Sequence, residues 1–125
     1  MNEIELTINR CKETNLISCL CASNAEETET IAKKHPDMMI VEIPELIGTG
    51  KAISTVNPQV VLDAIKVIKE IDNEIFVISG SGISTKEDVT KAVELGMQGV
   101  GASRAFCTAD NPKDVLTEMV LALIK

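Results

Sequence analysis

The chain has 125 residues, of which 45% are hydrophobic and 25% charged, and its formal net charge at pH 7 is −7. This length predicts a single domain, residues 1–125, with enough apolar side chains for a core. The negative charge, with two Phe and no Trp or Tyr, argues against nucleic-acid binding. The sequence has no apolar run of about 18 residues and no signal-peptide pattern, so we expect a cytoplasmic protein that does not bind membranes.

Helices and strands are expected to alternate along the chain. Helical spacing of apolar residues and local stop signals predict helices over 3–14, 25–34, from Pro58 onward, from Ser84 to about Leu95, and over 112–124. Apolar runs predict strands over Leu16–Ala22, Met38–Val41, Glu74–Ser79 and Gly99–Ser103.

Several residues mark the expected helix ends. Ser23 or Asn24 is a suitable N-cap, and Pro58 stands at a first helical position. Ser84-x-x-Glu87 has the spacing of a capping box, and Gly96 suits a helix C-terminus. On the last helix, Val115, Met119 and Leu123 are expected to share one apolar face.

The order of elements, one helix followed by four strand–helix units, predicts a parallel sheet with right-handed crossovers. Four such units make half of a (β/α)₈ barrel, and a small open four-stranded α/β sheet is the alternative. Either arrangement leaves apolar edge strands, and a half-barrel also exposes the apolar inward face of its sheet.

The four cysteines show no metal-binding pattern. Cys11, Cys19, Cys21 and Cys107 form no C-x-x-C pair, and His35 is the only histidine, so we predict no metal site. Cys19 and Cys21 lie in an apolar run in which alternate residues share a face, and we expect both in the core as small apolar side chains.

The stretch from Met38 to Gly50 carries the strongest functional signal. The apolar run Met38–Val41 predicts a strand buried on both faces, as in a parallel sheet. It ends in Glu42, and a loop punctuated by proline and glycine follows. Because α/β proteins place catalytic groups at the C-terminal ends of their strands, Glu42 is a candidate catalytic residue. A solvated carboxylate at a strand end is the alternative.

Two further strand ends are rich in glycine. Gly80-Ser81-Gly82 precedes the helix expected from Ser84, and Gly99–Arg104 ends the last strand. Short glycine turns let backbone N–H groups approach an anion, and helix N-termini favour negative charge. These turns therefore predict a phosphate site, with ordinary turns as the alternative.

Residues 42–50, Glu-Ile-Pro-Glu-Leu-Ile-Gly-Thr-Gly, resemble the lid loop of triosephosphate isomerase, most closely the archaeal form. In that family a Glu-Pro pair opens the loop and Ile-Gly-Thr-Gly closes it, so Glu42 falls on the catalytic base. Ile43 stands where the family has proline, which implies a looser N-terminal hinge for the lid. Residues 80–84, Gly-Ser-Gly-Ile-Ser, are similar to the family's Gly-Ala-Gly-Ile-Ser.

The resemblance covers essentially the whole chain but only the C-terminal half of the family's barrel. It implies a half-barrel over residues 1–125 and the interconversion of dihydroxyacetone phosphate and glyceraldehyde 3-phosphate, without a cofactor. It implies that the substrate phosphate binds near Ile47, Gly48, Gly82, Ser103 and Arg104, largely through backbone amides. Arg104 departs from the family, in which a small residue is usual, so its side chain would crowd the phosphate or add a positive charge.

The family also uses an Asn and a Lys at the end of its first strand and a His at the end of its fourth, and this chain contains none of these segments. His35 precedes the strand that carries Glu42, so we expect it at the opposite end of the barrel as a solvated turn residue. We therefore expect a weak or inactive isolated chain that acts as a homo-oligomer or with a complementing N-terminal half-barrel chain. A non-catalytic phosphate-binding module and a self-associating module are the alternatives.

Overall fold

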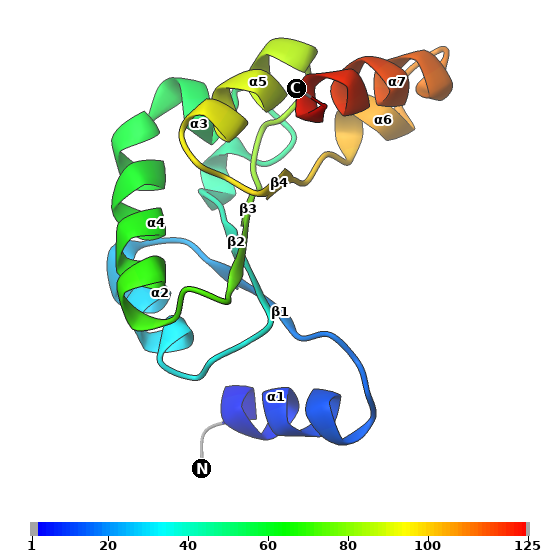
Figure 1. Cartoon of the computed structure of the whole chain (residues 1–125). Coiled ribbons are helices and arrows are strands. Elements are labelled where there is room, and N and C mark those ends of the chain that lie inside the picture. Colours follow the sequence, from blue (N-terminus) through cyan, green and yellow to red (C-terminus); the bar gives the residue numbers. More distant parts are fainter. Residues whose placement is uncertain (1–2, 125) are drawn as a thin grey trace.

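The computed structural model describes residues 3–124 and contains one four-stranded parallel sheet (Figure 1). Its strands, in sequence order across the sheet, are β1 (Cys19–Ala22), β2 (Met38–Val41), β3 (Phe76–Ser79) and β4 (Gly99–Val100). Ala22, Val41, Ser79 and Val100 pair in one row across the sheet. The loops that follow the strands therefore leave the sheet at the same level, and the predicted parallel topology is confirmed.

Five longer helices alternate with the strands as expected. They are α1 (Glu3–Glu13), α2 (Ala25–Ala32), α4 (Pro58–Ile71), α5 (Lys86–Glu94) and α7 (Pro112–Leu123). Three short helices were not predicted: η1 (Pro44–Leu46), α3 (Ile53–Val56) and α6 (Arg104–Cys107). At three or four residues each, they are too short to produce a helical repeat of apolar residues.

Side chains fix the starts of two helices. Asn24 caps α2 by accepting a hydrogen bond from the Glu27 amide at 2.9 Å. The capping box of α5 lies one residue later than predicted, because Thr85 accepts from the Asp88 amide at 3.2 Å and Asp88 accepts from the Thr85 amide at 3.0 Å. The predicted pairing of Ser84 with Glu87 is therefore wrong, and α5 begins at Lys86.

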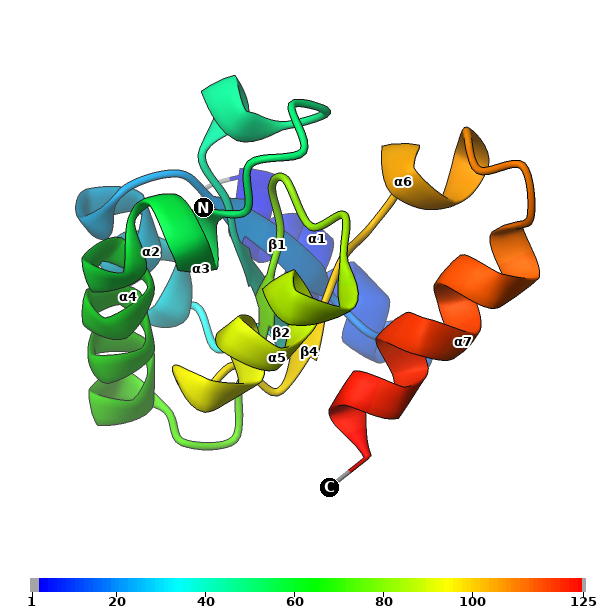
Figure 2. The ribbon, with the colours of Figure 1, turned by 90° about the horizontal axis from the view of Figure 1, so that it is seen from above.

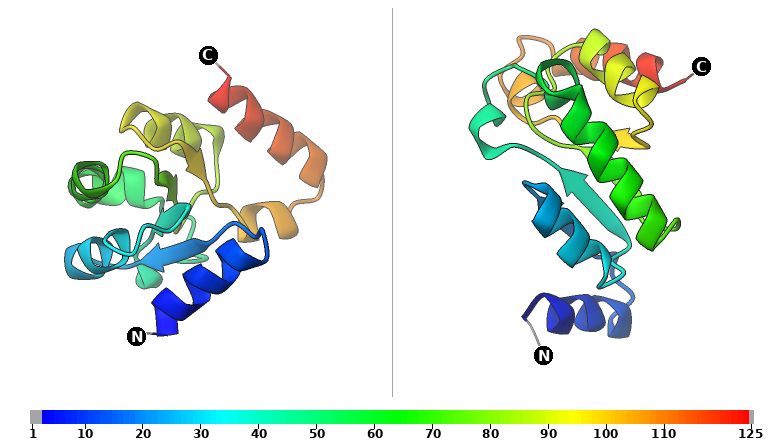
Figure 3. Two further views of the ribbon diagram at one scale, coloured as in Figure 1. Left: turned by 60° about the horizontal axis from the view of Figure 1, so that its bottom comes forward. Right: turned by 90° about the vertical axis from the view of Figure 1, so that its left-hand side faces the viewer.

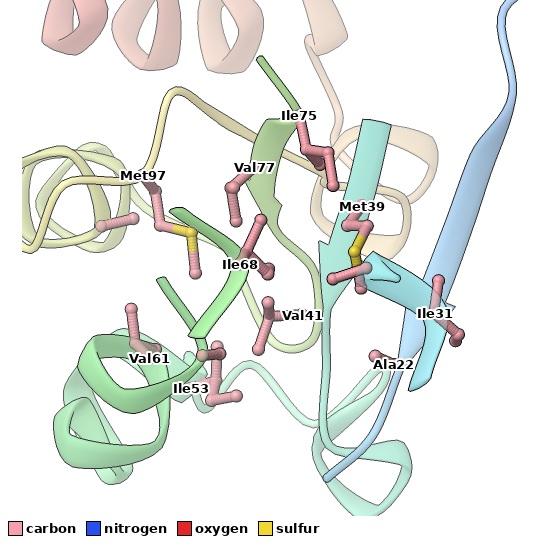
Figure 4. Close-up of a cluster of buried hydrophobic side chains, with 13 residues drawn as sticks. Ala22, Ile31, Met39, Val41, Ile53, Val61, Ile68, Ile75, Val77 and Met97 are labelled. Atoms are coloured by element: carbon pink, nitrogen blue, oxygen red, sulfur yellow. The ribbon is translucent and has the colours of Figure 1, made fainter. Parts of the chain in front are cut away.

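One face of the sheet is covered by helices and forms the main core. Met39 and Val77 are fully buried there, and Val61 and Ile68 of α4 pack onto the same cluster (Figure 4). Helices α2, α4 and α5 lie on this outer side of the curved sheet (Figure 3, left). Val61 and Ile68 thus belong to the sheet-facing side of α4.

A second, smaller core joins the last two long helices, which run side by side (Figure 2). It contains Ala52, Ile83, Val89, Met119 and Ala122. The predicted apolar face of α7 is correct at Met119 but wrong at Leu123, which is 43% exposed. Since Ala52 and Ile83 belong to loops after β2 and β3, this core also anchors the loops that follow the strands.

The inner face of the sheet is not covered within residues 3–124. Cys19, Cys21 and Phe76 are exposed there, and Met38 and Ile40 are half-buried. The expectation that Cys19 and Cys21 belong to the core is therefore wrong, and so is full burial of β2 on both faces. The first strand is also shorter than predicted, since Leu16 and Ile17 are exposed and precede it.

Candidate active site

The loops that follow β2, β3 and β4 enclose a pocket of about 850 Å³. All six residues predicted for the site line it: Glu42, Ile47, Gly48, Gly82, Ser103 and Arg104. They come from three separate loops, which the parallel register brings to one end of the sheet.

Glu42 leaves the end of β2 beside the pocket, half-buried. Its amide donates to the Ala22 carbonyl at 3.1 Å, which continues the strand pairing. Its side chain packs against Gly80, where an added Cβ would lie 2.7 Å from the Glu42 Cβ and 2.7 Å from the Ile40 Cγ2. Because Gly80 has no side chain, it leaves room for the Glu42 carboxylate.

Cys21 contacts the Glu42 carboxylate from the neighbouring strand. Desolvation, followed by a hydrogen bond to Glu42 and the negative charge of that carboxylate, raises the pKa of Cys21 to about 11. The thiol thus remains protonated and acts as a donor to Glu42 at neutral pH. The analysis of the sequence placed Cys21 in the core and missed this contact, although Cys21 and Glu42 stand near the ends of successive predicted strands.

Both ends of the lid, residues 42–50, are tied to the loop after β3. The Ile43 amide donates to the hydroxyl of the buried Ser81 at 3.0 Å, and the Ser84 hydroxyl donates to the Gly50 carbonyl at 3.3 Å. Proline has no amide hydrogen and alanine has no hydroxyl, so the hinge bond depends on two departures from the family pattern, Ile43 and Ser81. The hinge therefore carries a hydrogen bond at Ile43, and its looseness stays a prediction.

Four of the five predicted phosphate-binding residues have backbone amides that are available to an anion. Within residues 3–124 the N–H groups of Gly48, Gly82, Ser103 and Arg104 have no hydrogen-bond acceptor. The Ile47 amide differs, because it donates to the Pro44 carbonyl at 3.1 Å inside η1. Ile47 therefore lines the pocket without an available backbone donor.

Gly82 requires the absence of a side chain. Its φ is +80°, and an added Cβ would lie 1.9 Å from the Lys51 carbonyl oxygen. Only glycine permits this close approach between the loop after β3 and the end of the lid.

The N-terminus of α5 is occupied by its own carboxylate. Asp88 accepts hydrogen bonds at 3.0 Å from the Ser84 amide, the Ser84 hydroxyl and the Thr85 amide. Asp88 therefore supplies negative charge at this helix start.

Arg104 extends from α6 to the lid, where its Nη1 donates to the Gly48 carbonyl at 2.7 Å.

His35 lies away from the pocket, exposed, with its Nδ1 2.6 Å from Asp72 Oδ2. That hydrogen bond is the main cause that lowers the pKa of Asp72. The expected position of His35 in a turn at the opposite end of the strands is confirmed, and no three His, Cys, Asp or Glu residues of the described chain are placed to hold a metal.

Comparisons with known proteins place these features in a family. The family model of triosephosphate isomerase matches residues 1–122. The triosephosphate isomerase of Methanobrevibacter smithii is 40% identical over 121 residues, which are 97% of this chain and 54% of that protein. Those of Methanocaldococcus jannaschii and Sulfurisphaera tokodaii are 38% and 34% identical, over 94% and 100% of this chain and 54% of each relative.

Solved structures show the same fold at low identity. The thiamine phosphate pyrophosphorylase of Pyrococcus furiosus superposes with a TM-score of 0.69 at 20% identity, over 98% of this chain and 55% of that one. The Amycolatopsis orientalis BexX/CysO complex gives a TM-score of 0.68 at 17% identity, over 99% and 49%. The chain thus spans about half the length of the proteins it matches, and it belongs to the triosephosphate isomerase family.

Proposed function

We propose that this chain supplies the catalytic base and the phosphate site of a cytoplasmic triosephosphate isomerase, which interconverts dihydroxyacetone phosphate and glyceraldehyde 3-phosphate without a cofactor. One observation carries the proposal: Glu42, the lid and the turns at Gly82 and Ser103 meet at a single pocket. Family membership supports the same reaction.

Glu42 is the base in this proposal. Its carboxylate removes a proton from the carbon beside the substrate carbonyl, and the electron pair moves to form an enediolate. The protonated carboxyl then returns a proton to the former carbonyl carbon while the hydroxyl proton moves from one substrate oxygen to the other, so the substrate is isomerised without net gain or loss of atoms. Gly80 leaves space for the carboxylate, and the Cys21 thiol donates a hydrogen bond to it.

The substrate phosphate is held by backbone amides on three loops. Gly48, Gly82, Ser103 and Arg104 each offer an N–H that has no acceptor among residues 3–124. Amides fixed in short turns bind phosphate without flexible side chains. Ile47, whose amide is already used, contributes apolar cover from the lid.

The pocket, as residues 3–124 form it, lacks the His and Lys side chains by which the family stabilises the enediolate. Neither His nor Lys lines it, and the single histidine, His35, pairs with Asp72 elsewhere. Losing one oxyanion donor typically costs ~10²–10³ in rate. We therefore propose that residues 1–125 alone are weak or inactive, and that a second half-barrel segment supplies this donor.

The order of helices and strands at the two edges of the sheet indicates which elements that second segment contains. Helix α1 precedes β1 and helix α7 follows β4, whereas a closed barrel places one helix over each gap between strands. Two copies of this chain would bring α1 of one copy and α7 of the other to the same gap at each seam. We therefore favour a complementing segment, which begins and ends with a strand, rather than a homodimer. We expect the interface between that segment and this chain to bury more than ~1,000 Å².

The proposal is tested in a chimera that joins the N-terminal half of the Methanobrevibacter smithii relative to this chain. Glu42→Gln keeps the side-chain shape and removes the basicity. We expect turnover to fall by roughly 10²–10⁴, and the affinity for inorganic phosphate to change less than about twofold, because backbone amides bind it.

Glu45→Gln is the matched control. It removes a carboxylate from the same loop, on the exposed η1 turn, and turnover should stay close to that of the unmutated chimera. Equal turnover in the Glu42→Gln and unmutated chimeras, with phosphate still bound, would replace the enzyme by a phosphate-binding module.

A further inference from the structure

Arg104 is a side chain at the pocket that the family pattern does not explain. It stands where a small residue is usual, yet its side chain crosses from the start of α6 to the lid. Its Nη1 donates to the Gly48 carbonyl at 2.7 Å, and its Cδ would lie 3.9 Å from a Cβ added at Gly48. Arg104 therefore holds the glycine-rich part of the lid, in addition to the hydrogen bonds at the two ends of the lid.

The charge of Arg104 is not neutralised by a protein carboxylate. Within residues 3–124 no Asp or Glu oxygen lies within ion-pair distance of its guanidinium. A guanidinium carries five N–H donors in a planar fork, and the Gly48 carbonyl takes one of them. Donors therefore remain for a second acceptor, and phosphate is an acceptor that this fork matches well.

A positive charge at the pocket would strengthen the anion binding that the backbone amides provide. Among the described residues, Glu42 and Arg104 are the two charged residues that line it, and the whole chain carries a formal charge of −7. A phosphate monoester placed beside Glu42 is repelled by the carboxylate. Arg104 is the side chain positioned to offset that repulsion.

We propose that Arg104 is a positioning residue that joins the lid to the substrate phosphate. It holds Gly48 through the carbonyl and offers its remaining N–H groups to a phosphate monoester in the pocket. The ligand class rests on the proposed function, whereas the hold on the lid is a property of the unliganded chain. One side chain then contacts both lid and ligand, so phosphate binding and lid order are coupled, and the coupling acts equally in both directions.

Hydrogen exchange in the chain of residues 1–125 tests this coupling. The amides of Ile47 and Thr49 report lid order, because both donate within the lid, at 3.1 and 3.2 Å. In Arg104→Gln without ligand we expect both to exchange roughly three- to tenfold faster, as suits the loss of one hydrogen bond to a charged group. Affinity for inorganic phosphate should fall roughly tenfold, and phosphate should no longer slow exchange in the lid.

Two further variants separate the charge from the geometry. Arg104→Lys keeps the positive charge without the planar fork, so it should retain part of the phosphate affinity but not the lid protection. Arg10→Gln removes one arginine charge from α1, where Arg10 bonds Glu13 at 2.9 Å, and should behave as the unmutated chain. The Val77 amide, in the buried strand β3, reports global stability in every variant.

The proposal requires that Arg104→Gln both speeds hydrogen exchange in the lid and weakens phosphate binding. Unchanged lid exchange in Arg104→Gln overturns the hold on the lid, and unchanged phosphate affinity overturns the contact with the anion. If Arg10→Gln changed lid exchange and phosphate affinity as much as Arg104→Gln does, both changes would be due to the net charge of the chain. That result would overturn the proposal as well. Since no turnover is measured, failure of the Glu42 experiment leaves these outcomes intact.

Discussion

The two faces of the same four strands are buried to very different extents. On the outer face, Met39 and Val77 are 0% exposed, whereas Phe76 on the inner face is 38% exposed. Side chains on both faces are largely apolar, so hydrophobicity does not set the difference. The difference arises because, among residues 3–124, helices pack onto the outer face and leave the inner face open. An apolar strand therefore specifies burial without specifying what covers each side.

The two faces also divide stability from function. The outer face holds the main core with α2 and α4. The inner face leads from Cys21 and Ile40 to Glu42 and the pocket. Substitutions on the outer face should therefore change unfolding, and substitutions on the inner face should change the site.

Adjacent methionines give the most direct way to break this comparison. Met39→Ala should lower the free energy of unfolding by about 2–5 kcal/mol, since it leaves a cavity in a closed core. Met38→Ala changes the same residue type on the inner face, where solvent already reaches, and should cost less than about 1.5 kcal/mol. Urea unfolding of both variants measures the two values. Equal losses would mean that the inner face is as closed as the outer one.

The Cys21 thiol gives a second test, by its pH dependence. At a pKa of about 11, roughly one thiol in a thousand is ionised at pH 8. In a variant retaining Cys21 as the single cysteine, alkylation should therefore be up to about a hundredfold slower than for an ordinary thiol, rising about tenfold per pH unit towards pH 11.

Adding Glu42→Gln to that variant sharpens the result. It removes the carboxylate that accepts from the thiol, while desolvation, the larger cause, remains, so labelling at pH 8 should become faster but stay slower than for an ordinary thiol. A labelling rate independent of Glu42 would contradict the contact between the two side chains.

The smallest effect is expected at Ser79, a polar exception on the outer face. Its hydroxyl is fully buried and has no hydrogen-bond partner among the described residues. Ser79→Ala should therefore be neutral or raise the free energy of unfolding by up to ~1 kcal/mol. Ser81→Ala is the matched control, because it removes the acceptor of the Ile43 amide and should destabilise the chain. A clear loss of stability in Ser79→Ala would reveal a partner for the hydroxyl.

Much of the fold followed from local patterns. Met38–Val41 is long and apolar enough to define a strand to the residue, and Pro58 marks the start of α4. The short helix α6 and the early end of β4 did not follow, because four residues give no repeat to detect. The α5 capping box was displaced by one residue because Ser84 instead bonds both Asp88 and Gly50.

The sequence by itself determined the order of helices and strands and the parallel sheet, since these depend on spacing along the chain. The six predicted site residues came from the resemblance to triosephosphate isomerase. Only the tertiary structure decided that Cys21 meets Glu42, that Ser81 holds Ile43, and that Arg104 reaches Gly48. Each of these contacts joins residues far apart in sequence. Their geometry depends on strand register and loop path, which local propensities do not encode.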